Sequence, residues 1–322
     1  MGQVRLLLLT IAMTFLTFTG TAVADDYPSK PVRIIIPFAP GGFNDIAARV
    51  VATHLTQRLG QQVIAENKPG AGGVVGSELA AQSAPDGYTL TVVSIANAVQ
   101  PALYKLRFDP HKAFDMVSMF VSSPNTLAVN PKVPAKTLKE FVALAKSKPG
   151  EIAYASGGVG GSLHLGMEMF RLTTKTDLLH VPFKGAGPGR IDVIAGNTKA
   201  IVASASSLTA AIQSGQLRGL AIATPKRLAA LPDVPTFAEA GLPEYQGGNW
   251  IGFAVPAGTP KAIIAKLHKE IAAIQDMPEV QDQFAKRGSE IVKMAPAELK
   301  AFYDSELARW GNVVKQAGIK AQ

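Results

Sequence analysis

The sequence predicts an α/β fold of two lobes joined by two crossover segments, with a cleft between the lobes. Three observations predict it. Short apolar runs alternate with amphipathic helical segments along most of the 322 residues. Turn-rich and proline-rich stretches, at residues 125–134 and 227–244, set a middle block apart from the rest. Glycine-rich loops follow several apolar runs, at the edge where α/β sheets bind ligands.

The first 24 residues are expected to be a signal peptide. MGQVR carries one arginine, an apolar run follows it, and Ala22-Val23-Ala24 has the small-residue pattern of a cleavage site. We expect cleavage after Ala24 and export to the periplasm, with an uncleaved membrane anchor as the alternative. The mature chain then carries 31 basic and 24 acidic residues, a net charge of +7.

Lobe I is expected to open with strand–loop–helix units. The run VRIII predicts a strand at residues 32–36, and apolar residues at helical spacing predict a helix over 44–60 that ends at Gly60. Further expected elements are a strand at 61–67, a glycine loop and helix over 68–84, and a strand at 88–94. Strands that alternate with helices predict a parallel sheet with right-handed crossovers.

The middle block continues the same alternation. Its expected elements are helices at 137–148, 162–173, 190–196 and 208–215 and strands at 151–156, 178–183, 199–204 and 217–224. One more strand is expected within 249–260, and the remainder is predicted to be helical, including a helix from Pro296 to Gly318.

Two segments, near residues 126–130 and 248–253, connect the middle block to the rest, and a pair of crossovers makes a hinge. We therefore expect lobe I to comprise residues 25–127 plus 249–322, and lobe II residues 128–248.

The glycine loops indicate an anion site. In PFAPGGFND, Gly41 and Gly42 allow backbone N–H groups to approach a ligand at a helix N-terminus, where the helix dipole favours negative charge. Asn44 or Asp45 can instead serve to cap that helix. Because NKPGAGGVVG, ASGGVGGSLH and FKGAGPG also stand between a strand and a helix, the four loops predict a cleft lined by backbone donors.

Several other kinds of site are excluded. The chain has no cysteine, and its five histidines form no i, i+4 pair and no H-E-x-x-H motif, so neither a disulfide nor a metal site is expected. Basic residues are scattered, which predicts no nucleic-acid partner. GAGGVVG lacks the dinucleotide-binding spacing, and no cofactor is expected.

Five segments together carry a resemblance: PVRIIIPFAPGGFNDIAAR, ENKPGAGGVVGSELAAQSAPDGYTL, YASGGVGGSLHL, VPFKGAGPGRIDVIAGN and LPDVPTFAEAGLP. In this order and spacing they resemble the Bug family, the periplasmic substrate-binding proteins of tripartite tricarboxylate transporters. The resemblance implies a type II periplasmic-binding-protein fold that closes around a small organic carboxylate. It also implies membrane transporter subunits as partners, and we expect the receptor to be a monomer.

The resemblance also implies the ligand contacts. Those of lobe I are Gly41, Gly42, Phe43, Asp45, Gly72, Gly73, Ser94 and Asn97. Those of lobe II are Ser156, Gly157, Gly160, Ser162 and His164, with Lys184, Gly185 and Ser204 nearby.

Some of these residues have a structural alternative. Phe43 and Asn44 replace the two small residues that the family often carries at this point, and the Phe43 ring either admits an apolar ligand body or packs beneath the loop. Similarly, His164 is either a ligand contact or a structural histidine, and Lys184 either reaches the cleft or is solvated.

The alternative functions are an exported hydrolase or lyase and a ligand sensor subunit. GGSLH nearly matches the G-x-S-x-G motif of hydrolases, but His164 stands at its fifth position. Because no nucleophile with a positioned base is evident, we expect the protein not to be an enzyme.

Overall fold

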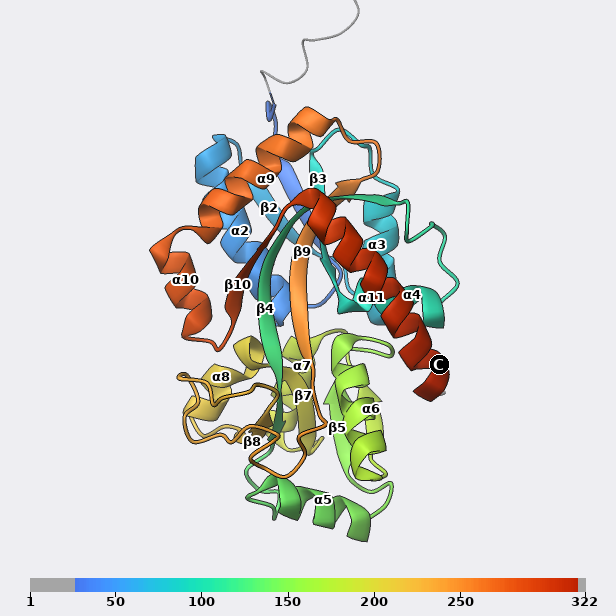
Figure 1. Cartoon of the computed structure of the whole chain (residues 1–322), viewed down its shortest axis with the longest axis vertical. Coiled ribbons are helices and arrows are strands. Elements are labelled where there is room, and N and C mark those ends of the chain that lie inside the picture. The colour runs from blue at the N-terminus through green and yellow to red at the C-terminus, as the bar shows by residue number, and fades with distance from the viewer. Residues whose placement is uncertain (1–26, 318–322) are drawn as a thin grey trace, which may run out of the picture.

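The computed structural model describes residues 27–317, which form an upper and a lower lobe along the long axis of the molecule (Figure 1). The expected signal peptide, its cleavage after Ala24 and the expected helix end at Gly318 lie outside the described residues. In the part of the chain that the structure describes, none of the helices has the length and apolar composition that a bilayer crossing requires.

The sheet of lobe I has the strand order β2-β1-β3-β9-β4, and β10 also pairs with β4. Its strands are β1 (Val32–Ile36), β2 (Val63–Asn67), β3 (Thr89–Ser94), β4 (Phe114–Val129), β9 (Gly248–Pro256) and β10 (Glu290–Met294). β1 is parallel to β2 and β3, as expected, but β9 runs antiparallel to β3 and β4. The expectation of a parallel sheet is therefore wrong for β9 and β10, because both strands run opposite to β4.

The sheet of lobe II uses the second half of β4. Its other strands are β5 (Ala153–Ser156), β6 (Leu179–Pro182), β7 (Ala200–Ser204) and β8 (Arg218–Ile222). β5 is parallel to β6 and β7, while β4 is antiparallel to β7 and β8. Together with lobe I, this arrangement confirms the expected two-lobe α/β fold.

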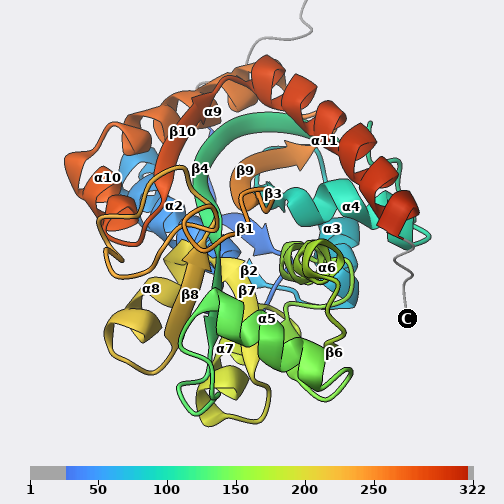
Figure 2. The ribbon, with the colours of Figure 1, turned by 60° about the horizontal axis from the view of Figure 1, so that its bottom comes forward.

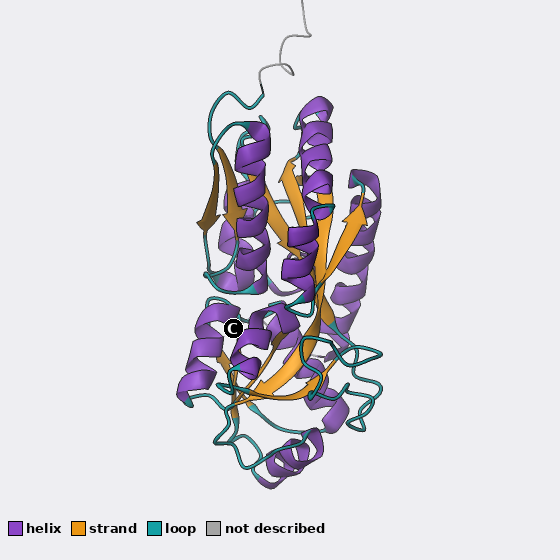
Figure 3. Cartoon of the chain, turned by 90° about the vertical axis from the view of Figure 1, so that its left-hand side faces the viewer, coloured by secondary structure: helices purple, strands orange, loops and turns teal. Residues whose placement is uncertain are grey.

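Helices cover both faces of the upper sheet (Figure 3). Lobe I carries α2 (Phe43–Leu59), the short η1 (Ala71–Gly73), α3 (Val74–Ala81), α4 (Ile95–Leu103), α9 (Lys261–Gln275), α10 (Pro278–Ala285) and α11 (Pro296–Ala317). Lobe II carries α5 (Leu138–Ser147), α6 (Ser162–Thr174), α7 (Ala186–Ala195) and α8 (Ala205–Gln213). The helix end at Gly60 is confirmed by its left-handed backbone, with φ 68°. The expectation that everything after 260 is helical is wrong at β10, which extends the sheet.

Strand β4 passes from one lobe into the other (Figure 2). Its last pairing with β9 is Pro124↔Gly248, and its first pairing with β7 is Asn125↔Ser204. The strand therefore changes partner between Pro124 and Asn125. The chain returns from lobe II to lobe I at the same level, at Gly248. The division of the chain at 127/128 and 248/249 remains a prediction.

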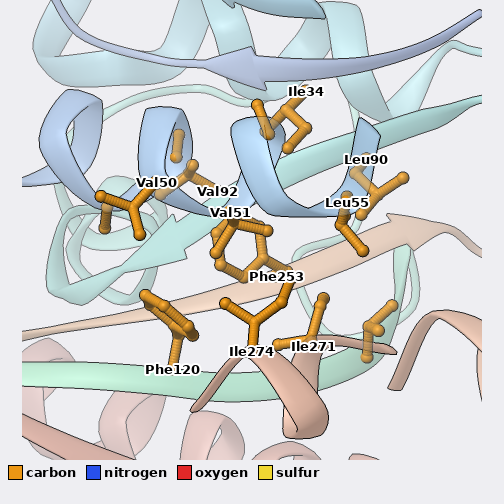
Figure 4. Close-up of a cluster of buried hydrophobic side chains, with 14 of the residues drawn as sticks. Ile34, Val50, Val51, Leu55, Leu90, Val92, Phe120, Phe253, Ile271 and Ile274 are labelled. Atoms are coloured by element: carbon orange, nitrogen blue, oxygen red, sulfur yellow. The ribbon is translucent and has the colours of Figure 1, made fainter. Parts of the chain in front are cut away.

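The core of lobe I fixes the helix that faces the cleft. Val51 and Leu55 of α2 pack with Phe253 of β9 and Ile271 of α9, and all four side chains are fully buried (Figure 4). Burial of each such side chain stabilises the fold by roughly 1.5–3 kcal/mol. The N-terminus of α2 is thereby held at the lower edge of the sheet.

Candidate ligand-binding site between the lobes

A cavity lies between the lobes and is lined from both. From lobe I and the crossover come Phe38, Gly42, Phe43, Asn44 and Asn249. From lobe II come Gly157, Gly161, Ser162, Leu163, Ala186, Ser204 and Ser207. None of these lining side chains is charged.

Four helices begin at this cavity. They are α2 from lobe I and α6, α7 and α8 from lobe II, and their N-cap residues are Gly42, Gly161, Gly185 and Ser204. Three of these N-cap residues are glycines, and at none of the four positions does a side chain accept a bond from a backbone N–H of the first turn. One first-turn donor has another partner, since the Ser206 N–H donates to Ser123 Oγ over 3.2 Å.

Of the helices that begin away from the cavity, α4 and α5 are capped by side chains, whereas the N-cap residues of α3, α9 and α10 form no such bond. Thr137 accepts a bond from the Glu140 N–H at the start of α5, and the Asn97 side chain accepts from the Ser94 N–H at the start of α4. Uncapped N–H groups and converging positive helix ends form a site for an anion, and here they come from both lobes.

Polar side chains complete the wall. Asn44 is 8% exposed, and its buried Oδ1 has no hydrogen-bond partner among residues 27–317. Ser204 and Ser207 share a hydrogen bond of 2.6 Å between their hydroxyls. An amide and hydroxyls at a buried wall can bind a ligand oxygen without adding charge.

Of the residues that the sequence implicates, the structure brings five together at the cavity: Gly42, Phe43, Gly157, Ser162 and Ser204. Phe43 is 3% exposed and also belongs to the hydrophobic core of lobe I. Its ring therefore packs beneath the loop while it forms part of the cavity wall.

A second group of the implicated residues forms the contact between the lobes. The Ala39 N–H of lobe I donates to the Lys184 carbonyl over 2.9 Å, while the Lys184 side chain is exposed. Gly41, Gly72 and Gly185 also lie where the two backbones approach one another, and Gly160 lies against the Leu103 and Tyr104 side chains of lobe I. The hydroxyl of Tyr104 in lobe I donates to the Val159 carbonyl in lobe II over 2.7 Å. With these contacts made, the structure is a closed form.

Asp45 serves the loop rather than the cavity. Its Oδ2 accepts from the Gly41 N–H over 2.9 Å, and its Oδ1 accepts from Arg49 and from Asn67, both over 2.9 Å. Because the N-cap residue is Gly42, Asp45 does not cap α2 from the N-cap position, but it fixes the loop in front of it.

Three more implicated residues stay within lobe I. Ser94 and Asn97 are buried at the start of α4, where Asn97 also donates to Ser77 over 3.0 Å. The Gly73 carbonyl accepts from Ser77 over 3.0 Å. None of the three is among the residues that line the cavity.

Ser156 and His164 belong to a buried aromatic stack behind the lobe II loop. The ring of His180 stacks on those of His164 and Tyr154, with centroid distances of 4.1 and 4.9 Å. His180 Nε2 lies 2.6 Å from Ser156 Oγ, and His164 Nδ1 accepts from the Gly160 N–H over 3.1 Å. These two bonds hold both ends of the Ser156–Gly160 loop that borders the cavity.

The stack keeps both imidazoles neutral. Burial lowers the pKa of His164. Burial and the neighbouring His164 lower the pKa of His180 to about 4. Neutral rings can accept the hydrogen bonds that fix the loop, so these histidines are positioning residues.

Seven lining residues were not implicated by the sequence: Phe38, Asn44, Gly161, Leu163, Ala186, Ser207 and Asn249. Asn44 directly follows Phe43. Ser207 lies three residues after Ser204, and residues at this spacing share one face of a helix, so the helical pattern is a signal for Ser207. Asn249 lies on the crossover strand, whose orientation follows from the pairing of the two sheets.

Comparison with known proteins agrees with this arrangement. Residues 47–319 match the model of the tripartite tricarboxylate transporter family receptor. Protein BugT of Bordetella pertussis is 36% identical over 97% of this chain and 98% of its own. A Rhodopseudomonas palustris protein solved as MatC with bound malate is 32% identical, with a TM-score of 0.85 over 89% of this chain and 100% of its own.

An R. palustris protein solved with adipate has a TM-score of 0.88 and 29% identity, over 92% of this chain and 99% of its own. The family match covers most of the sequence, and the resemblance stated from the glycine loops is confirmed. This chain belongs to the family of tripartite tricarboxylate transporter receptors, to which the Bug proteins belong.

Proposed function

We propose that the protein is a periplasmic receptor that binds one small organic carboxylate between its lobes and delivers it to a tripartite tricarboxylate-type membrane transporter. The observation that carries this proposal is the convergence of four uncapped helix N-termini on one cavity. Export from the cytoplasm, with cleavage after Ala24, belongs to the same proposal. The malate and adipate of the R. palustris structures support a carboxylate as the ligand class.

Contacts from both lobes allow a bound ligand to favour the closed form of the receptor. A ligand shifts an open–closed equilibrium only by the difference in its affinity for the two forms. Donors of α2 reach the cavity from lobe I, and those of α6, α7 and α8 reach it from lobe II. The transporter would then select the closed form.

A screen of carboxylates by thermal shift tests the ligand class. Mono-, di- and tricarboxylates are added to the mature protein, with amides of the same carbon skeletons as neutral controls. A carboxylate at about 100 times its Kd should stabilise the protein by about 2.7 kcal/mol. No stabilisation by any carboxylate, or equal stabilisation by the amides, would contradict the proposed function.

One observation favours a hydrolase as the second candidate. Ser156 Oγ and His180 Nε2 lie 2.6 Å apart, the distance of a nucleophile and its base. However, Ser156 is fully buried and is not among the residues that line the cavity. Mass spectrometry of a bound carboxylate after long incubation distinguishes the candidates: the receptor returns it unaltered, whereas a product that disappears in Ser156→Ala favours the hydrolase.

A further inference from the structure

Arg190 is a half-buried cation directly behind the cavity wall. It lies one helical turn along α7 from Ala186, which lines the cavity. Its Nη1 donates to the carbonyl of Ser207, another lining residue, over 2.6 Å. The same nitrogen lies 3.4 Å from the carbonyl of Gly41, across the interface in lobe I.

The charge of Arg190 has no carboxylate partner within residues 27–317, since both contacts of its guanidinium are with backbone carbonyls. Asp45, the acid of the adjoining loop, is already bonded to Arg49, Asn67 and Gly41.

A second cation approaches from the other lobe. Arg287 follows α10 in lobe I, and its carbonyl accepts from Thr209 of lobe II over 3.2 Å. Burial lowers the pKa of Arg190, and the positive charge of Arg287 lowers it further. In the closed form the positive charge of Arg287 therefore acts on Arg190, whose own desolvation is already costly.

An anion in the cavity would compensate these charges. The helix N-termini carry only partial charges, which are spread around the cavity wall. A full positive charge nearby would further stabilise a second negative charge on the ligand, and the lining side chains supply none. We propose that Arg190 is the residue that selects doubly charged carboxylates over singly charged ones, acting through the cavity wall.

This inference rests on the proposed function and assigns a specificity role within the same site. Arg190 acts through the electrostatic potential in the cavity, so its charge rather than its shape is what matters. Arg190→Lys should therefore retain most of the discrimination, whereas Arg190→Gln should lose it.

Arg218 offers a matched control. It lies in lobe II, and among the described residues its guanidinium also donates only to backbone carbonyls, those of Val133 and Ala135, over 3.3 and 2.9 Å. These partners belong to lobe II and lie outside the cavity wall. Arg218→Gln thus removes the same charge and the same type of bond without touching the interface.

The experiment measures affinity by calorimetry for four- to six-carbon dicarboxylates and for their monoamides, in which one carboxylate is replaced by a neutral group of similar shape. In the wild type we expect the dicarboxylate to bind more tightly than its monoamide. Arg190→Gln should weaken dicarboxylate binding about tenfold, the effect of a full charge several ångströms away in a partly polar medium. The affinity of Arg190→Gln for the monoamide should change less than about twofold. The affinities of Arg218→Gln for both compounds should also change less than about twofold.

An unchanged ratio of dicarboxylate to monoamide affinity in Arg190→Gln would overturn the assignment and leave the proposed function intact. An equal loss for both compounds would overturn it too, since that result describes a general contribution to closure. If the wild type binds no carboxylate in the panel, the proposed function fails, and the role of Arg190 fails with it.

Discussion

Gly187→Ala is expected to weaken carboxylate binding by roughly a hundredfold, or about 2.7 kcal/mol, while the protein remains folded. A Cβ at Gly187 would lie 2.0 Å from the carbonyl oxygen of Pro40, on the backbone of the opposite lobe. Backbone cannot move aside as a flexible side chain does, so the lobes could not reach the closed form. The residue adopts an ordinary helical conformation, and alanine favours a helix by up to about 1 kcal/mol over glycine.

Gly189→Ala is the matched control for this substitution. It adds the same methyl group to the same helix two residues later, but the nearest atom is Ala155 Cβ of the same lobe at 3.4 Å, an ordinary contact. Calorimetric titration should therefore show near wild-type affinity for Gly189→Ala. Equal affinities for the two variants would mean that closure between α7 and the Pro40 loop does not contribute to binding.

The free energy of unfolding is expected to fall by about 2 kcal/mol between pH 6.5 and pH 4 through His180, when its shift is discounted for partial exposure. Burial and His164 hold the pKa of His180 at about 4 in the folded protein, against 6.5 ordinarily. The unfolded chain therefore takes up a proton in this window while the folded protein does not. The contribution is fully present above pH 6.5 and is lost as the pH falls toward 4. The lowered pKa of His164 adds a loss in the same direction.

Urea unfolding at a series of pH values, with and without His180→Gln, measures this effect. The variant lacks the titrating ring, so its free energy of unfolding should depend less steeply on pH than that of the wild type. A pH dependence as steep in the variant as in the wild type would show that other groups cause the acid sensitivity.

The glycine loops were predictable because their signal is local. A strand followed by glycines and an amphipathic segment determines where a helix N-terminus stands, and α2, α6 and α7 begin at or near such loops. Which glycine borders the cavity and which contacts the other lobe depends on how the lobes meet. Gly42 lines the cavity and Gly185 packs on Ala39, and nothing in their neighbouring sequence separates the two roles.

The crossover strand β4 was not predictable from its sequence beyond its last residues. Its first half is buried on both faces and so lacks the alternation of a half-exposed strand, and Pro124 within it predicts a break. The strand tolerates Pro124 because its pairing changes there from β9 to β7. The stack of His164, His180 and Tyr154 was not predictable from the sequence either, because its three rings come from three separate elements.

Small-angle X-ray scattering of the mature protein, with and without a saturating carboxylate chosen from the thermal-shift screen, tests most directly whether the lobes close on an anion. If they do, the radius of gyration of the wild type should decrease when the carboxylate is added, and that of Gly187→Ala should not. A wild-type scattering curve that does not change at saturation would contradict closure by the ligand.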